Sequence, residues 1–371
     1  MMNRQTKRLS GRHLLWKGVA AAAAAALTLT GCSNSGTDGA TTGTSGATED
    51  TEIGVSLILK TTTNPFFVAM QKGAEEAAAT QGVNLTVAAG REDGDEDTQI
   101  QAIENAISRG DAGILITPSG QAVEEALIKA RDAGLYVIAL DTPPSSPDAV
   151  DITFATDNFL AGQLIGEWTA SALDGGDAVI AMLDLFDDKV VSVDYARDQG
   201  FLTGMGIDVA DPEVNGDEAK TGSYSGGNYT IVGNQATQGA EDGGRTAMEL
   251  LLAQNPDVNV VYTINEPAAY GAKAALDAAG KTDVLIVSVD GGCAGVDGVA
   301  SGVIGATSQQ YPLKMAELGV AAIADLVRTG TTPDVTEGLT FFNTGVALVT
   351  DKPANGVESI DTAAGSAICW G

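Results

Sequence analysis

The feature of this 371-residue sequence that most constrains its fold is a regular alternation of short apolar runs with helix-forming segments. The runs have the length and the β-branched composition of strands, and they recur from residue 53 onward. They are apolar throughout, which is typical of strands buried on both faces of a parallel sheet. The sequence therefore predicts an α/β fold made of doubly wound parallel sheets.

The expected elements follow one another with short connections. In the first half the expected strands and helices cover residues 53–59, 65–81, 83–88, 97–108, 112–117, 122–133, 135–140, 152–155 and 159–173. In the second half they cover residues 178–183, 190–205, 229–232, 241–254, 258–263, 268–279, 284–289, 303–306 and 313–328, with 208–228 as an irregular surface excursion. Because one ordinary sheet cannot hold so many units, we expect two similar lobes.

The first fifty residues predict export. Five basic side chains open the chain, and the apolar run over residues 19–27 is too short to span a bilayer but has the length of a signal-peptide core. The run ends in Leu29-Thr30-Gly31-Cys32, which resembles a bacterial lipobox. We therefore expect a signal peptide over residues 1–31, a lipid on Cys32 and a flexible tether over residues 32–51. This predicts an extracytoplasmic protein that is lipid-anchored to the outer face of the bacterial cell membrane.

Charge and histidine content argue against several classes of function. The formal net charge is −29, and the predicted signal peptide contributes only basic side chains, so the remainder is more acidic still. Such a surface argues against a nucleic-acid partner. The single histidine, His13, lies in the predicted signal peptide, so the mature chain has no histidine for acid–base catalysis or metal ligation. We expect no cofactor and no metal.

Two cysteines remain beyond the predicted lipidation site, Cys293 and Cys369. Disulfides form and persist outside the cytoplasm. We expect these two residues to form a disulfide that fastens the C-terminus to a loop.

One short stretch stands at a predicted strand-to-helix turn, where open α/β sheets bind their ligands. It contains Asn64, which can cap the following helix, and Pro65, which suits the first helical position. Phe66 and Phe67 follow where a loop is normally polar. Both rings can belong to the core, or at least one can form an apolar wall of a binding site. An aromatic wall beside amides and carboxylates suits a sugar, which has apolar C–H faces and a rim of hydroxyl groups.

Polar side chains recur at or just beyond the ends of apolar runs in both predicted lobes. These residues are Asn64, Asp141, Asn265, Asp290 and Gln310. Each of them alone can be a helix cap or a turn residue. Two facing lobes would instead direct all five into one cleft.

With these motifs in place, the sequence resembles the ribose/galactose-type periplasmic binding proteins, the solute receptors of bacterial ABC sugar importers. The resemblance extends from about residue 53 to 349. It is carried by Asn64-Pro65-Phe66-Phe67, Asp141, Arg197-Asp198-Gln199-Gly200-Phe201, Asn265-Glu266-Pro267, Ser288-Val289-Asp290-Gly291 and Gln310-Tyr311-Pro312, which occur in the family's order and at its spacing. The tract over residues 307–312 and the Gly291-Gly292-Cys293 turn look most like the fructose-binding lipoproteins.

The resemblance implies a role for each matching residue. Phe66 and Phe67 would flank the sugar, and its hydroxyl groups would be bound by Asn64, Asp141, Asn265, Asp290 and Gln310. Arg197 would bond the ring oxygen or a neighbouring hydroxyl, although a surface ion pair with Asp194 or Asp198 is the alternative. Two positions depart from ribose binders: Thr142 replaces an arginine, and an aromatic residue is missing near Gln238 and Gly239. These departures should change which sugar fits.

The function predicted from the resemblance is the binding of a monosaccharide, with fructose favoured over ribose, glucose, galactose or xylose. The expected partners are an ABC permease and its ATPase, and we expect a monomer. The predicted lobes comprise residues 52–156 plus 311–341 and residues 157–310 plus 342–371. Three crossings would form a hinge near residues 156–157, 310–311 and 341–342.

Three other functions are alternatives to this prediction. A receptor feeding a chemotaxis or sensor-kinase system would have the same cleft. A glycosidase needs two carboxylates across the scissile bond, and Asp141 and Asp290 could serve. However, Arg197 and the flanking amides favour the ionised form of both aspartates, which suits binding better than acid catalysis. We therefore expect that the protein is not an enzyme. A transcriptional repressor of related fold is excluded, because the chain is acidic and no DNA-reading helices are visible at its N-terminus.

Overall fold

The computed structural model describes residues 52–371. The predicted signal peptide, the lipidation site Cys32 and the tether lie outside the described residues. Within the part of the chain that is described, no helix combines the length and the apolar character needed to cross a membrane.

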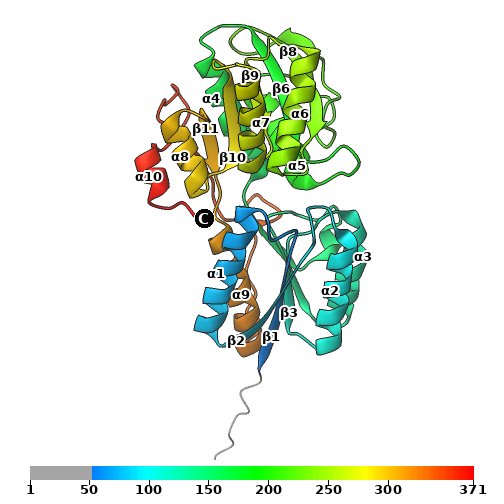
Figure 1. Cartoon of the computed structure of the whole chain (residues 1–371). Helices are drawn as coiled ribbons and strands as arrows, with labels where there is room; N and C mark the ends of the chain where they lie inside the picture. Colours follow the sequence, from blue (N-terminus) through cyan, green and yellow to red (C-terminus); the bar gives the residue numbers. More distant parts are fainter. Residues whose placement is uncertain (1–51) are drawn as a thin grey trace, which may run out of the picture. The chain divides into compact units, whose positions relative to one another are not determined.

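The first lobe is built on a six-stranded sheet with the order β12-β5-β4-β3-β1-β2 (Figure 1). All of its strand pairs are parallel. Its strands are β1 (Ile53–Leu59), β2 (Val83–Ala89), β3 (Gly113–Ile116), β4 (Tyr136–Leu140), β5 (Ile152–Ala155) and β12 (Phe342–Asn343). Helices α1 (Pro65–Gln81) and α9 (Pro312–Thr329) cover one face, and α2 (Glu96–Arg109) and α3 (Glu124–Asp132) cover the other. Short 3-10 helices span Gln121–Val123 and Pro147–Ala149.

The second lobe is built on a seven-stranded sheet with the order β13-β11-β10-β9-β6-β8-β7. Its central strands are parallel, and β13 and β7 add antiparallel edges. The strands are β6 (Ala178–Asp184), β7 (Thr221–Ser223), β8 (Asn228–Ala236), β9 (Val260–Thr263), β10 (Leu285–Asp290), β11 (Ala306–Gln309) and β13 (Ala347–Val349). Helices α4 (Asn158–Ala172) and α5 (Ser192–Met205) pack on one face, and α6 (Glu241–Gln254) and α7 (Glu266–Ala278) pack on the other. Two short helices, α8 (Cys293–Ser301) and α10 (Thr362–Ser366), complete it.

The predicted α/β class with two doubly wound lobes is confirmed. The start of α1 shows how the local sequence specifies it. The Asn64 side chain accepts a hydrogen bond from the Phe66 amide at 2.9 Å, and Pro65 occupies the first helical position. Gly82 ends the helix with a φ of 62°, a left-handed conformation that glycine adopts at little cost.

The structure corrects three sequence predictions. Strand β11 lies three residues beyond the predicted 303–306, and three of its four residues are polar. The third crossing between the lobes follows Asn343 rather than residue 341, because β12 pairs with β5 in the first sheet and β13 lies in the second. The Phe342 ring packs edge-on against Phe154, with centroids 5.3 Å apart, which ties β12 to the first lobe. The predicted excursion over residues 208–228 also contains β7.

Candidate functional site

A cavity between the two lobes is lined by all eight residues that the sequence predicted to bind a ligand. They are Asn64, Phe66, Phe67, Asp141, Arg197, Asn265, Asp290 and Gln310. The lining also includes Lys60, Asp93, Leu185, Val193 and Ile264. The site lies where parallel strands of both sheets end, the usual position of ligands in open α/β sheets.

Arg197 lies at the centre of the polar side of this cavity. It projects from α5 and is 5% exposed. Its guanidinium donates to Asn158 Oδ1 at 2.8 Å, to the Ile264 carbonyl at 3.0 Å and to Gln310 Oε1 at 3.2 Å. One of its nitrogens also lies 3.7 Å from Asp141 Oδ1. The alternative role of Arg197, a surface ion pair, is therefore wrong, and its side chain connects residues of both lobes.

Asp290 and Gln310 continue this polar network. Gln310 Nε2 donates to Asp290 Oδ1 at 3.1 Å, while its Oε1 accepts from Arg197. Burial raises the pKa of Asp290 to about 7, although the nearby Arg197 charge opposes the shift. A hydroxyl group reaching this network can donate to the carboxylate and accept from the guanidinium.

Two of the three aspartates that line the cavity, Asp141 and Asp290, have unusual backbone conformations. The φ angle is 65° at Asp141 and 142° at Asp290, a region that non-glycine residues rarely adopt. Such strain persists where the surrounding structure imposes it, and it is frequent at functional sites. Here it places a carboxylate at the end of a strand in each lobe.

Phe66 and Phe67 belong to the core and also line the cavity, so the two interpretations of these rings are compatible. They pack edge to face, with centroids 5.4 Å apart and an interplanar angle of 89°. Asn64 and Asn265 likewise combine two roles. Each caps a helix through its side-chain oxygen, and Asn265 also donates to the Gly239 carbonyl at 3.0 Å.

Two further charged residues of the cavity, Lys60 and Asp93, were not predicted from the sequence. Lys60 directly follows β1 and is 2% exposed, and Asp93 lies a few residues beyond β2. Asp93 Oδ1 is buried, and no group of residues 52–371 forms a hydrogen bond with it. Burial raises the pKa of Asp93, and the Lys60 charge partly offsets this shift. The sequence signal that identified the other polar residues, a position just beyond an apolar strand, also applies to Lys60 and Asp93.

The two departures from ribose binders have structural consequences. Thr142 is buried, and its hydroxyl donates to Asp141 Oδ2 at 2.8 Å. Gly239 has a φ of 63°, and a side chain added there would approach the Asn265 amide at 3.0 Å. Gln238 lines a larger adjoining cavity of about 710 Å³, which shares Asn64, Asp93 and Asp290 with the inner one.

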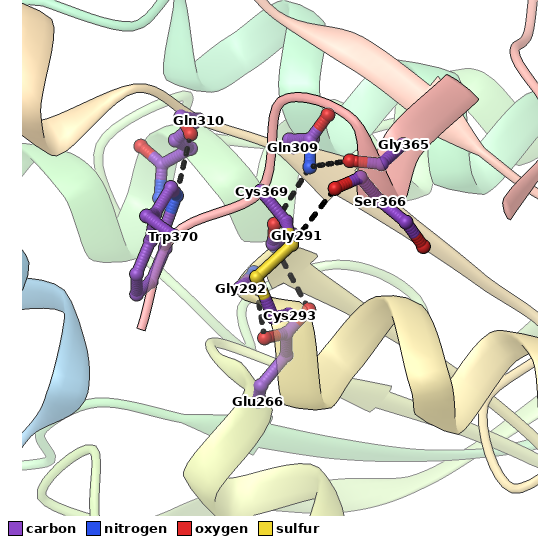
Figure 2. The surroundings of a disulfide bond; sticks show 10 residues. All are labelled: Glu266, Gly291, Gly292, Cys293, Gln309, Gln310, Gly365, Ser366, Cys369 and Trp370. Atoms are coloured by element: carbon purple, nitrogen blue, oxygen red, sulfur yellow. Dashed lines mark hydrogen bonds between the residues drawn. A yellow bond between two sulfur atoms is a disulfide. The ribbon is translucent and has the colours of Figure 1, made fainter. Parts of the chain in front are cut away.

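Cys293 and Cys369, the predicted pair, form a disulfide that attaches the C-terminal segment to α8 (Figure 2). Among residues 52–371, no group of three or more acidic, histidine or cysteine side chains is arranged to hold a metal ion.

Because several carboxyl groups are buried, we expect the free energy of unfolding to fall as the pH rises. Burial raises the pKa of Asp184 to about 7 and that of Glu266 to about 8. At pH values between the unfolded-state and folded-state pKa, the folded protein binds more protons than the unfolded chain. The stabilisation that these two groups contribute is therefore complete below about pH 4 and is lost as the pH rises to about 7–8. We expect a higher midpoint of thermal unfolding near pH 5 than near pH 8, measured by circular dichroism.

An exposed carboxylate provides the matched control for this measurement. Asp184→Asn should flatten the dependence, whereas Asp325→Asn, at an exposed site on α9, should not. A midpoint that rises from pH 5 to pH 8 would contradict the prediction.

Comparison with known proteins adds to this geometry. A family model described as a periplasmic binding protein domain matches residues 53–332. The chain is 30% identical over 277 residues to the ribose import binding protein RbsB of Haemophilus influenzae, covering 74% of this chain and 86% of that protein. It is 29% identical over 282 residues to the D-apiose import binding protein of Actinobacillus succinogenes, covering 75% and 83%.

Solved structures share the fold. An ABC transporter solute binding protein from Agrobacterium vitis, bound with α-D-tagatopyranose, has a TM-score of 0.68 at 23% identity and covers 86% of this chain and 100% of its own. A protein from Mycobacterium smegmatis in complex with β-D-fucofuranose also has a TM-score of 0.68 at 23% identity, covering 85% and 93%. The match to residues 53–332, on a fold of two lobes with a cavity between them, shows that the chain belongs to the periplasmic binding protein family.

Proposed function

We propose that this chain is the extracytoplasmic substrate-binding protein of an ABC importer and binds a monosaccharide between its two lobes. The observation that carries the proposal is the network of Arg197, Gln310 and Asp290 in a cavity whose other wall is Phe66 and Phe67. Charge-assisted hydrogen bonds to hydroxyl groups are about twice as strong as neutral ones. The aromatic rings suit the C–H face of a sugar. The relatives named for ribose and apiose import support the same class of ligand.

Fructose is the first candidate among the monosaccharides. This preference rests on the resemblance of residues 307–312 and of the Gly291-Gly292-Cys293 turn to fructose-binding lipoproteins. Thr142 supplies no guanidinium where ribose binders have one, which weakens the case for ribose. Ribose, glucose, galactose and xylose complete the set to be tested.

Closure of the two lobes around the ligand is part of the proposal. The inner cavity is about 30 Å³, enough for about two water molecules, so a monosaccharide needs the lobes to separate before it can enter. Contacts across the cleft include Ser192 Oγ donating to the Pro143 carbonyl at 2.7 Å and Lys189 Nζ donating to the Gly94 carbonyl at 2.8 Å. The three chain crossings supply the hinge.

A thermal-unfolding screen over these sugars tests the proposed function. A ligand at 100 times its dissociation constant adds about 2.7 kcal/mol to the free energy of unfolding. At least one sugar should raise the melting temperature of the wild type, and Asp290→Ala should reduce that shift. A wild type that responds to no sugar, or that converts the bound sugar into another product, contradicts the proposal.

We also propose that Cys32 carries a lipid that anchors the protein to the membrane. Cys32→Ser should release the protein into the soluble fraction, because the thiol that accepts the lipid is lost. Fractionation followed by mass spectrometry of the N-terminal peptide measures the effect, with Cys32→Ala as a second variant. A wild type that retains residues 1–31 would contradict the anchor.

A further inference from the structure

We propose that Trp370 is a positioning residue of the ligand cavity, held in place by the Cys293–Cys369 disulfide. Its ring would support Phe66 and stabilise the closed arrangement of the lobes. We call Cys293, Cys369 and Trp370 the C-terminal clasp. The proposal rests on the proposed function, because it concerns how the same cavity holds a sugar.

The clasp is fixed to the second lobe by several contacts. The disulfide joins α8 to the C-terminal segment, with the two Cα atoms 4.9 Å apart. The Cys293 amide donates to the Trp370 carbonyl at 2.8 Å. Upstream, Gln309 Nε2 donates to the Gly365 carbonyl at 3.2 Å, which attaches α10 to the end of β11 (Figure 2).

The Trp370 ring, in contrast, packs into the first lobe. It meets Phe66 edge to face, with centroids 5.4 Å apart and an interplanar angle of 80°. Trp370 is 7% exposed and belongs to the same apolar cluster as Phe67 and Met70. A residue covalently tied to one lobe is therefore buried in the core of the other.

The ring also contacts one of the chain crossings. Its Nε1–H donates to the Gln310 carbonyl at 2.8 Å. The Gln310 side chain forms hydrogen bonds with Arg197 and Asp290. Gln310 therefore contacts Trp370 through its backbone and the polar residues of the cavity through its side chain. Figure 2 shows Trp370 and Gln310 joined by this bond, on the side of the disulfide away from α10.

On the side of the second lobe, the absence of a side chain at Gly292 leaves room for the Trp370 ring. A Cβ added at Gly292 would lie 3.3 Å from the Trp370 ring, closer than most real Cβ contacts. Because the ring lies between Gly292 of one lobe and Phe66 of the other, separation of the lobes must break at least one of these contacts. Its packing energy therefore favours the closed state, and apparent ligand affinity falls when the closed state is less populated.

Calorimetric titration of variants with the sugar identified in the thermal screen tests the clasp. Trp370→Ala should weaken binding about 10-fold, because Phe66 loses its support and the closed state loses its bridge. Trp370→Phe should lose less, since it keeps a ring but not the N–H donor. Ile368→Ala is the matched control, because Ile368 lies beside Cys369 but is 49% exposed; it should bind like the wild type.

The disulfide is tested by combining substitutions. Cys293→Ser with Cys369→Ser should weaken binding by less than Trp370→Ala does. Adding the two cysteine substitutions to Trp370→Ala should cause little further loss of affinity, because the disulfide acts through the Trp370 ring. Full additivity, with no coupling between the two changes, would show that the disulfide and the ring act separately and would overturn the proposal.

A readout without ligand separates this inference from the proposed function. Small-angle X-ray scattering of the sugar-free protein should show a larger radius of gyration for Trp370→Ala than for the wild type and for Ile368→Ala. If no sugar binds the wild type, the proposed function fails, and the scattering result alone decides the clasp. Unchanged scattering overturns the clasp, as does unchanged affinity in Trp370→Ala when the wild type binds sugar.

Discussion

Arg197→Ala is expected to weaken sugar binding by roughly 30- to 5,000-fold, the equivalent of about 2–5 kcal/mol for a buried charge-assisted contact. Its guanidinium donates to residues of the second lobe and to the Gln310 crossing, and it lies beside Asp141 of the first lobe. Without it the pKa of Asp290, already raised to about 7 by burial, rises further. A protonated Asp290 is a weaker acceptor for a hydroxyl group.

Titration calorimetry on folded protein measures this loss. Arg197→Lys should recover little affinity, because an ammonium group cannot reproduce the planar fork of donors. Arg245→Ala is the matched control, since Arg245 is an exposed arginine of α6 that pairs with Glu249 outside the cavity. Affinity within about threefold of the wild type would mean that the ligand binds elsewhere.

Lys60→Met and Asp93→Asn are each expected to weaken binding by roughly 10- to 150-fold, from about 1.5–3 kcal/mol for a hydrogen bond to a charged group. Lys60 is almost fully buried and lines the cavity. Asp93 Oδ1 is buried and accepts no hydrogen bond from the described part of the chain, so a sugar hydroxyl that donates to it satisfies a buried acceptor. A sugar that lacks or inverts this hydroxyl leaves the acceptor unpaired, so the pair should contribute to selectivity.

The measurement compares the preferred sugar with its epimers on each variant. If Lys60 and Asp93 read one hydroxyl group, the affinity ratio between epimers should narrow in both variants. Lys72→Met serves as the control, because Lys72 is an exposed lysine on α1. Wild-type affinity together with wild-type selectivity in both variants would remove these residues from the site.

Local sequence signals were enough to locate most of the polar residues that line the cavity. Asn64 and Pro65 start α1 through interactions with their own neighbours in the chain. Asp141 directly follows β4 and Asp290 is the last residue of β10, and all parallel strands of a sheet end at one edge, so their convergence can be inferred without coordinates. The same reasoning applies to Lys60 and Asp93 once residues slightly further from each strand end are included.

Features that depend on distant partners could not be predicted in this way. The position of strand β11 is one such feature, because Thr307 and Ser308 are polar and in the buried strand they donate to Glu266 and to the Ala161 carbonyl, both far away in sequence. The short strand β12 belongs to the first sheet because it pairs with β5, almost two hundred residues earlier.

The α/β class, the two lobes and the polar groups at the strand ends can be inferred from the sequence, because periodicity, helix caps and strand termini are local properties. The orientation of Arg197 toward the cavity and the packing of Trp370 on Phe66, in contrast, become evident from the three-dimensional fold. These outcomes depend on which lobe supplies the burial and the hydrogen-bond partners. These partners come together when the chain folds into two facing lobes. They are far apart in the sequence, so the residues next to Arg197 or Trp370 do not reveal them.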